Sequence, residues 1–151
     1  MPDKKPEELK LITMAEIETE QVEWLLYPFI PYGKVTIIQG DPGEGKTTMV
    51  LQMIARLTRG EPVFPKEELE NPSKGNGTPI TVLYQTAEDG LGDTIKPRLT
   101  AAGADCSRVI VIDDREKALT MMDERLETAI KETAARLVVL DPIQGYLGAD
   151  V

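Results

Sequence analysis

Four short apolar runs alternate with longer segments in which apolar and polar residues are mixed. The runs are rich in β-branched residues and end at glycine or polar residues, which predicts buried strands. Strands that are apolar throughout and alternate with helices are typical of a parallel sheet covered on both faces. The pattern therefore predicts an α/β fold with a parallel sheet and helices on both faces. The predicted strands are residues 34–40, 80–86, 108–114 and 137–141.

The segment after the first predicted strand has the spacing of a helix. Residues 46–60 place apolar side chains on one face, and Gly60 is typical of a helix end. Residues 61–79 are rich in proline, glycine and charge, which predicts a surface loop. The apolar face of the helix consists of Val50, Met53, Ile54 and Leu57.

Two further helices are predicted. One covers residues 94–103, with Pro97 in the first turn, where its missing N–H loses no hydrogen bond. The other covers residues 120–136, with Thr120 as the expected cap and Asp123 three residues later. Its apolar stripe consists of Met122, Leu126 and Ile130.

The first 30 residues are predominantly acidic, and they end in an aromatic-rich stretch that leads into the first predicted strand. This stretch is interpreted as a hydrophobic flap that packs on the domain. A role for Trp24 or Tyr27 in stacking on a ligand is the alternative.

Charge and composition exclude several function classes. The formal net charge of −9 argues against a broad basic surface that follows nucleic-acid phosphates, although a local basic loop stays compatible with it. The chain has no histidine, which excludes cysteine–histidine and serine–histidine catalysis and histidine metal sites within it. Cys106 is the single cysteine, so no disulfide forms within the chain, and a cytoplasmic location is expected.

The same composition argues against a membrane partner. No apolar run reaches the roughly 18 residues that a membrane span needs. The N-terminus lacks the apolar core of a signal peptide.

The stretch GDPGEGKT matches the phosphate-binding pattern G-x-x-x-x-G-K-[ST], with a predicted strand before it and a helix after it. Glycines let backbone N–H groups turn toward phosphates, and the helix start adds a favourable dipole. Lys46 supplies a charge for the β- and γ-phosphates, and the Thr47 hydroxyl can occupy one position on Mg²⁺. The alternative is a glycine-rich turn that carries a lysine by chance. The predicted nucleotide-binding residues are Gly40, Asp41, Pro42, Gly43, Glu44, Gly45, Lys46, Thr47 and Thr48.

Two carboxylates follow other predicted strands and complete the candidate site. Asp141 ends an apolar strand, where a carboxylate can hold the Mg²⁺ shell; a cap on the turn at Pro142 is the alternative. Glu88 follows the second strand, where it can orient an attacking water, with Asp89 as the second candidate. A solvated acidic turn is the alternative for Glu88, and a place at a helix N-terminus is the alternative for Asp89.

Four stretches together suggest a family. The chain resembles the RecA-like branch of P-loop ATPases, and within it the RepA-like AAA-type ATPases of replication helicases and primase-helicases of plasmids, phages and mobile elements. The stretches are IPYGKVTIIQGDPGEGKTTM, VLYQTAEDGLGDTIKPRLTAAGAD, RVIVID and LVVLDPIQGYLGAD.

The resemblance implies ATP and Mg²⁺ as cofactors. It implies that Lys46 and Thr47 bind phosphate and the metal, that Asp141 is the Walker B aspartate, and that Glu88 is the catalytic glutamate. For Arg98 it implies a structural or inter-subunit role. Gln144 could contact the site, but a turn residue is the preferred interpretation.

The resemblance also implies an incomplete core. Cores of this branch continue past the Walker B strand with a helix and a strand that lies between the Walker B strand and the P-loop strand. This sequence stops at Val151 before them. A partial RecA-like domain over residues 31–151, preceded by the acidic segment 1–30, is therefore expected, with apolar strand edges exposed. ATPase activity is assigned to the parent protein.

Three functions are compatible with the sequence. The first is a motor, a homo-oligomeric ring or filament that hydrolyses ATP and moves on single-stranded DNA in replication, with an arginine supplied by a neighbour. The second is a regulatory switch whose nucleotide state controls assembly. The third is a remnant fold without activity. Stimulation of turnover by DNA separates the first from the second.

Overall fold

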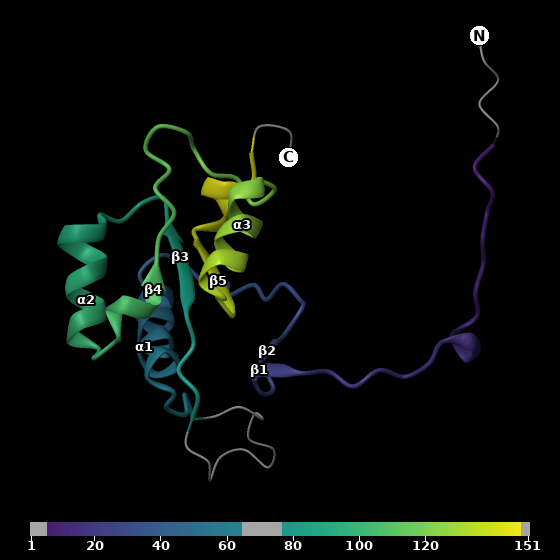
Figure 1. Cartoon of the computed structure of the whole chain (residues 1–151), viewed down its shortest axis with the longest axis horizontal. Helices are drawn as coiled ribbons and strands as arrows, with labels where there is room; N and C mark the ends of the chain where they lie inside the picture. The colour runs from purple at the N-terminus through teal and green to yellow at the C-terminus, as the bar shows by residue number, and fades with distance from the viewer. Residues whose placement is uncertain (1–5, 65–76, 149–151) are drawn as a thin grey trace.

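A three-stranded parallel sheet lies at the centre of the molecule, in the order β4–β3–β5 (Figure 1). The computed structural model describes residues 6–64 and 77–148. The central strand β3 spans Val82–Thr86, and its neighbours are β4, Val109–Ile110, and β5, Leu137–Asp141. Both pairings are parallel, so the predicted α/β class is confirmed.

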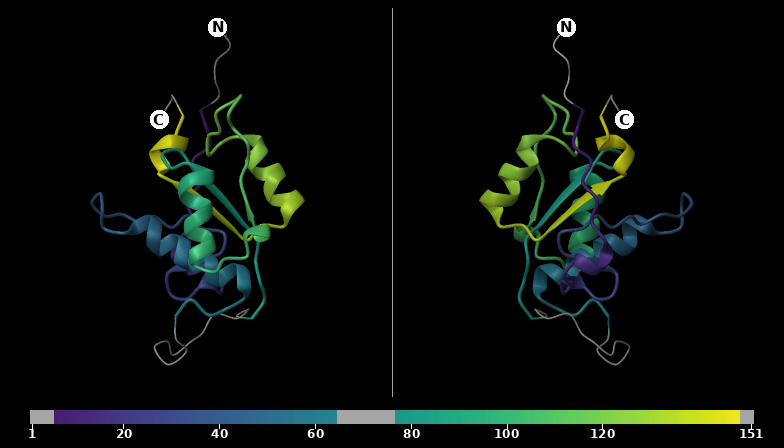
Figure 2. Two further views of the ribbon diagram at one scale, coloured as in Figure 1. Left: turned by 90° about the vertical axis from the view of Figure 1, so that its left-hand side faces the viewer. Right: turned by 90° about the vertical axis from the view of Figure 1, so that its right-hand side faces the viewer.

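Helices cover the sheet from two sides. Helix α1, Lys46–Arg59, follows the glycine-rich loop, and α2, Lys96–Ala101, follows a single π-helical turn, η3, at Leu91–Ile95. Helix α3, Glu124–Thr133, lies on the side of the sheet opposite to α2 (Figures 1 and 2). Helices on both faces of a parallel sheet were predicted from the alternation of elements, and this arrangement is confirmed.

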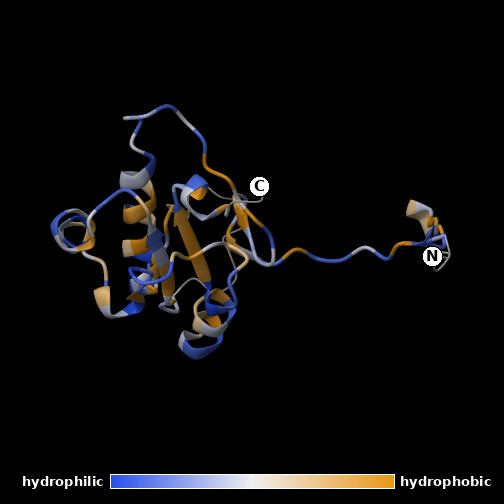
Figure 3. Cartoon of the chain, turned by 90° about the horizontal axis from the view of Figure 1, so that it is seen from above, coloured by the Kyte–Doolittle hydropathy of each residue, from blue (hydrophilic) through white to orange (hydrophobic). Residues whose placement is uncertain are grey.

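The main core lies between the sheet and the two helices α1 and α2. Ile54 on α1 and Tyr84 on β3 are both fully buried in it. The apolar strands consequently appear at the centre of the molecule when it is coloured by hydropathy (Figure 3). The other buried residues of this cluster are Val50, Leu51, Val82, Ile95 and Leu99.

Glycine fixes both ends of α1. Gly45 precedes the helix at φ 81° and Gly60 follows it at φ 70°, a backbone region that favours glycine. The backbone N–H of Gly60 donates to the carbonyl of Leu57 at 3.2 Å, which satisfies one of the free carbonyls at the helix end. The predicted helix over 46–60 is confirmed to within one residue.

A small antiparallel hairpin precedes the glycine-rich loop. Its strands are β1, Trp24–Leu26, and β2, Ile30–Pro31, and the side chains of Leu25 and Leu26 are buried. The rings of Trp24 and Tyr27 meet edge to face at 5.3 Å. The predicted packing of this stretch on the domain is therefore confirmed for the two leucines, whereas Phe29 is 57% exposed.

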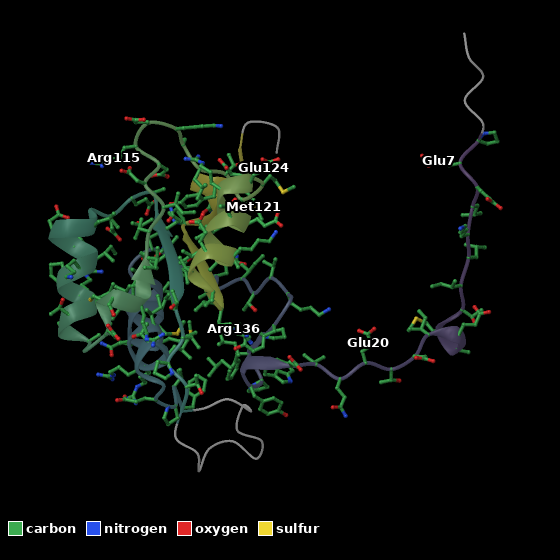
Figure 4. The ribbon with its side chains drawn as sticks, viewed as in Figure 1. Glu7, Glu20, Arg115, Met121, Glu124 and Arg136 are labelled. Atoms are coloured by element: carbon green, nitrogen blue, oxygen red, sulfur yellow. The ribbon has the colours of Figure 1, made fainter. Side chains whose placement is uncertain are left out.

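A cation–π contact ties this hairpin region to the sheet. The guanidinium of Arg136, just before β5, lies 4.6 Å from the centre of the Tyr32 ring. Figure 4 labels Arg136 near the hairpin. Upstream, residues 6–23 run away from the sheet as an exposed, mostly extended segment with one 3₁₀ turn, η1, at Met14–Glu16 (Figure 1).

The predicted strand over 34–40 is wrong. Residues 35–40 form no strand, and Val35 and Ile37 are 75% and 70% exposed. A strand needs a neighbour for its backbone N–H and carbonyl groups, and no described strand lies beside this segment. Among the described strands, β5 likewise pairs only with β3, and the residues of β5 are only partly buried.

The predicted strand over 108–114 is shorter than expected because a side chain replaces part of the ladder. Strand β4 pairs with β3 only through Val109 and Ile110. Beyond Ile110, the buried side-chain amide of Gln85 replaces the backbone pairing between the two segments. Its Nε2 donates to the carbonyl of Ile112 at 3.3 Å, and its Oε1 accepts from the Ile112 N–H at 2.7 Å. The chain therefore stays beside β3 without forming a regular strand.

The third predicted helix begins later than expected. Helix α3 starts at Glu124, and its cap is Asp123, which accepts a hydrogen bond from the Arg125 N–H at 2.9 Å. Thr120 is not the cap. Met122 lies before the helix and is 84% exposed, so it does not belong to the apolar stripe. Asp123 is held by the Arg125 side chain as well, and these hydrogen bonds lower the pKa of Asp123 to about 2.

Two further predictions concern one helix and one loop. The helix predicted over 94–103 is present as α2 with its preceding π turn, and Pro97 lies in the first turn of α2 as expected. Most of the loop predicted over 61–79 lies outside the described residues.

The contrast between Ile54 and Ile37 gives a stability test. We expect Ile54→Ala to lower the free energy of unfolding by about 2–5 kcal/mol, because it opens a cavity in a closely packed core. Ile37→Ala makes the same chemical change at an exposed site and should shift it by less than about 0.5 kcal/mol. Urea unfolding of the two variants checks this. Equal losses would mean that residues 35–40 are packed in a sheet.

Candidate functional site

The glycine-rich loop turns sharply into α1. Gly43 and Gly45 have φ values of 82° and 81°, which L side chains rarely adopt. A Cβ at either position would meet no atom within 4 Å, so the backbone conformation rather than crowding requires glycine there. Asp41, Pro42 and Thr48 are exposed around this turn.

Lys46 closes the loop from the helix side. As the first residue of α1, it directs its ammonium group back over the loop. Its Nζ donates to the carbonyl of Gly40 at 2.6 Å and to that of Asp41 at 2.8 Å. The cationic group is therefore held inside the loop, where an anion bound by the loop would meet it.

Glu44 folds back across the same loop. Its Oε2 accepts a hydrogen bond from the backbone N–H of Asp41 at 2.8 Å. A Cβ at Gly40 would lie 2.6 Å from this oxygen, so the carboxylate also covers Gly40. A carboxylate oxygen thus occupies one of the backbone donors that the sequence pattern assigns to phosphate.

Thr47 and Asp141 meet although they are 94 residues apart in the chain. The Thr47 hydroxyl, in the first turn of α1, donates to Oδ2 of Asp141 at 2.9 Å. Asp141 is the last residue of β5 and lies at the carboxyl end of the parallel sheet. The structure therefore brings together the two residues that were predicted to serve a metal.

Tyr84 also contacts this carboxylate and was not singled out from the sequence. Its hydroxyl donates to Oδ2 of Asp141 at 3.2 Å. Burial raises the pKa of the Tyr84 hydroxyl well above its ordinary value, and the charge of Asp141 and the hydrogen bond to it raise it further. A tyrosine within an apolar strand was the available signal, because a buried hydroxyl usually has a polar partner.

A second buried tyrosine lies nearby without such a partner. Tyr146 belongs to a 3₁₀ turn, η5, at Ile143–Tyr146. Its hydroxyl is buried and makes no hydrogen bond within the described residues. Burial raises the pKa of Tyr146 to about 12, and the charges of Asp114 and Asp141 contribute to the shift.

Glu88 lies at the same edge of the sheet as Asp141. The register pairs Thr86 with Asp141, and the Ala87 N–H continues the ladder by donating to the Asp141 carbonyl at 3.1 Å. Glu88 follows immediately and is exposed. Asp89 is partly buried, and its N–H donates to the Thr86 hydroxyl at 3.2 Å. Among the described residues, the Glu88 side chain makes no hydrogen bond or ion pair.

The remaining predicted residues lie outside this arrangement. Arg98 is exposed on α2, and its side chain has no partner among the described residues. Gln144 is exposed in η5. Trp24 contacts Tyr27, and no described contact joins it to the glycine-rich loop.

The donor set fits a small divalent cation. The described residues contain no cluster of three or more His, Cys, Asp or Glu side chains, so an ion held by the protein alone is not indicated. One hydroxyl and one carboxylate, both oxygen donors, lie together at Thr47 and Asp141. This combination suits Mg²⁺, which keeps several waters and is bound by few protein oxygens together with phosphate.

The fold and site define a class. A lysine-bearing glycine loop that opens a helix, with an aspartate at the end of a neighbouring parallel strand, is the arrangement of a P-loop nucleotide-binding domain. The AAA domain family matches residues 4–151, and the chain therefore belongs to this family, with an α/β P-loop fold of the RecA-like kind.

A curated relative agrees with this assignment. The chain is 28% identical over 119 residues to the DNA repair protein RadA of Bacillus subtilis (strain 168). The similarity covers 79% of this chain and 20% of the relative, so the chain spans about a fifth of that protein's length. No solved structure gives a significant match. Within the described residues, no helix is long and apolar enough to cross a membrane.

Proposed function

We propose that this chain binds ATP with Mg²⁺ at the glycine-rich loop and forms the hydrolytic core of a RecA-like ATPase. The observation that supports it best is the 2.9 Å contact between Thr47 and Asp141, which joins the loop side of the site to the end of β5. Such a contact would suit a site for a metal-bound phosphate, whereas a turn that carries a lysine by chance would not require it.

Each residue of the site then has a definite task. Lys46 leaves the carbonyls of Gly40 and Asp41 and pairs with the β- and γ-phosphates. Thr47 and Asp141 hold the Mg²⁺, which supplies positive charge against the phosphates. Glu88, exposed at the carboxyl end of β3, orients the attacking water and accepts its proton. The loop itself supplies backbone N–H donors and the start of α1.

For the protein to which this core belongs, we propose a helicase-type role in DNA replication, as a homo-oligomer that acts on single-stranded DNA. The resemblance to RepA-like ATPases supports this choice, and the similarity to a protein named for DNA repair supports a role on DNA more generally. The alternative is a switch ATPase that controls assembly without moving on DNA. The net charge of −9 favours this alternative, because it opposes a broad contact with phosphates.

Turnover measured with and without single-stranded DNA separates these roles. The motor requires DNA to accelerate ATP hydrolysis, whereas the switch does not need this acceleration. Glu88→Gln serves as the blank in both conditions, because a contaminating ATPase would be unaffected by it.

Lys46→Ala tests the loop directly. We expect ATP affinity in the presence of Mg²⁺ to fall by about tenfold or more, because a hydrogen bond to a charged group contributes about 1.5–3 kcal/mol. Lys34→Ala is the matched control, since Lys34 is exposed and has no partner among the described residues. Equilibrium binding of ATP gives the result. An affinity that Lys46→Ala leaves unchanged would refute the loop as the phosphate site.

Glu88→Gln tests the hydrolytic assignment. ATP binding should be retained while turnover falls by at least about 100-fold, the usual contribution of a general base. Asp89→Asn is the comparison and should keep most of the turnover. If Asp89→Asn abolishes turnover and Glu88→Gln does not, the two roles are reversed. Loss of binding in Glu88→Gln would show that Glu88 is structural.

Glu44→Ala tests whether the carboxylate competes with phosphate. The variant should bind ATP about three- to tenfold more tightly, because it frees the Asp41 N–H and removes a negative charge worth about 1 kcal/mol against a nearby phosphate. Glu116→Ala removes the same charge at an exposed residue elsewhere and should leave affinity unchanged. Titration calorimetry with ATP measures both. Weaker binding in Glu44→Ala would mean that Glu44 supports the bound loop instead.

A further inference from the structure

The carboxylate of Asp141 receives two hydrogen bonds at one oxygen. Oδ2 accepts from the Thr47 hydroxyl at 2.9 Å and from the Tyr84 hydroxyl at 3.2 Å. Within the described residues, no hydrogen bond reaches the other oxygen, Oδ1. The two donors therefore restrain Oδ2, and the lone pairs of Oδ1 are not used by any described donor.

The two donors differ in how firmly they are held. Thr47 lies in the first turn of α1, beside an exposed loop. Tyr84 is fully buried in the middle of β3, within the core formed with α1 and α2. A closely packed ring cannot turn without disturbing its neighbours, so its hydroxyl stays in one place. Tyr84 is thus the rigid support of the pair.

The strand register explains why Tyr84 reaches this carboxylate. Tyr84 is paired with Val139, and Asp141 lies two residues further along the same strand. Residues two apart on a strand share a face, and a diagonal neighbour on the adjacent strand is within reach of an aromatic side chain. A phenylalanine at this position would fill nearly the same space without donating a hydrogen bond to Asp141.

We propose that Tyr84 is a positioning residue for Asp141: its hydroxyl holds the carboxylate in the orientation that meets Thr47 and so sets the affinity of the site for Mg²⁺. This inference rests on the proposed function, because it assigns Asp141 to the metal. Hydrogen-bond partners of a metal-bound carboxylate commonly determine its orientation in this way.

Mg²⁺ dependence provides the first test. Binding of a fluorescent ATP analogue is measured over a range of Mg²⁺ concentrations in the wild type and in Tyr84→Phe. The Mg²⁺ concentration at half-maximal binding should rise by about tenfold in the variant, as expected for loss of a partner of a metal-binding carboxylate. Binding in EDTA should be equal in the two proteins, because Tyr84 acts only through Asp141.

Tyr146→Phe is the matched control. Tyr146 is another buried tyrosine near Asp141, but its hydroxyl has no hydrogen-bond partner within the described residues. The same chemical change should therefore leave the Mg²⁺ midpoint where it is. An equal shift in both variants would overturn the proposal, because it would reflect general loosening of the core.

A stability cycle without nucleotide provides the second test. Tyr84→Phe, Asp141→Ala and the double variant are unfolded in urea. Each variant changes the equilibrium constant of unfolding by some factor. If the hydroxyl and the carboxylate interact as described, the product of the two single-variant factors should exceed the factor for the double variant by about fivefold or more. Additive effects would overturn the hydrogen bond itself, and an unchanged Mg²⁺ midpoint in Tyr84→Phe would overturn its role.

Failure of the proposed function has a different signature. In that case the wild type itself would show no Mg²⁺-dependent binding of the analogue, and the metal role of Tyr84 would fall with it. The stability cycle would still report the contact between Tyr84 and Asp141, so the two failures are separated.

Discussion

The hydrogen bond between Thr47 and Asp141 is the contact on which the site depends. It joins the start of α1 to the end of β5, and both partners are positioned by packing elsewhere. The buried face of α1, with Ile54 at its centre, fixes the helix against β3, and the pairing of β3 with β5 fixes Asp141. The hydrogen bond between Thr47 and Asp141 thus depends on the burial of apolar side chains around Ile54, which lies about two turns further along α1.

Charged side chains of the glycine-rich loop have hydrogen-bond partners within the loop itself. Lys46 is held by two carbonyls, and the Asp41 N–H is held by the Glu44 carboxylate, so the loop has partners before any phosphate arrives. A polyphosphate approaching a protein of net charge −9 meets unfavourable long-range electrostatics. Local cations must therefore outweigh them, and Lys46 together with Mg²⁺ would supply this charge. This is why the Mg²⁺ dependence is central to the account.

The sequence was sufficient to predict those elements whose residue pattern lies within a single segment of the chain. Helix α1 and strands β3 and β5 have long apolar patterns and clear glycine or polar ends. The meeting of Thr47 with Asp141 could be anticipated as well, because the sequence pattern assigned both side chains to the same Mg²⁺. The segment 35–40 reads as a strand for the same local reason, but forming a strand depends on a neighbour that the local pattern cannot reveal.

Contacts made by single side chains could not be predicted in this way. Gln85 replaces part of the ladder to Ile112, and Tyr84 reads as an ordinary core aromatic until its partner is known. Glu44 occupies a variable position of the loop motif, so the motif does not predict that its carboxylate accepts a hydrogen bond from the Asp41 N–H. These contacts arise from the tertiary arrangement, and they decide how the site is held.

The most direct test of the central claim is to map the amide resonances of this 16.7 kDa chain by NMR as Mg²⁺ and a nonhydrolysable ATP analogue are added. The account requires the largest shifts at residues 40–48 and at Asp141, with smaller ones at Ala87 and Glu88. Saturable shifts confined to another surface, or none in the glycine-rich loop, would contradict it.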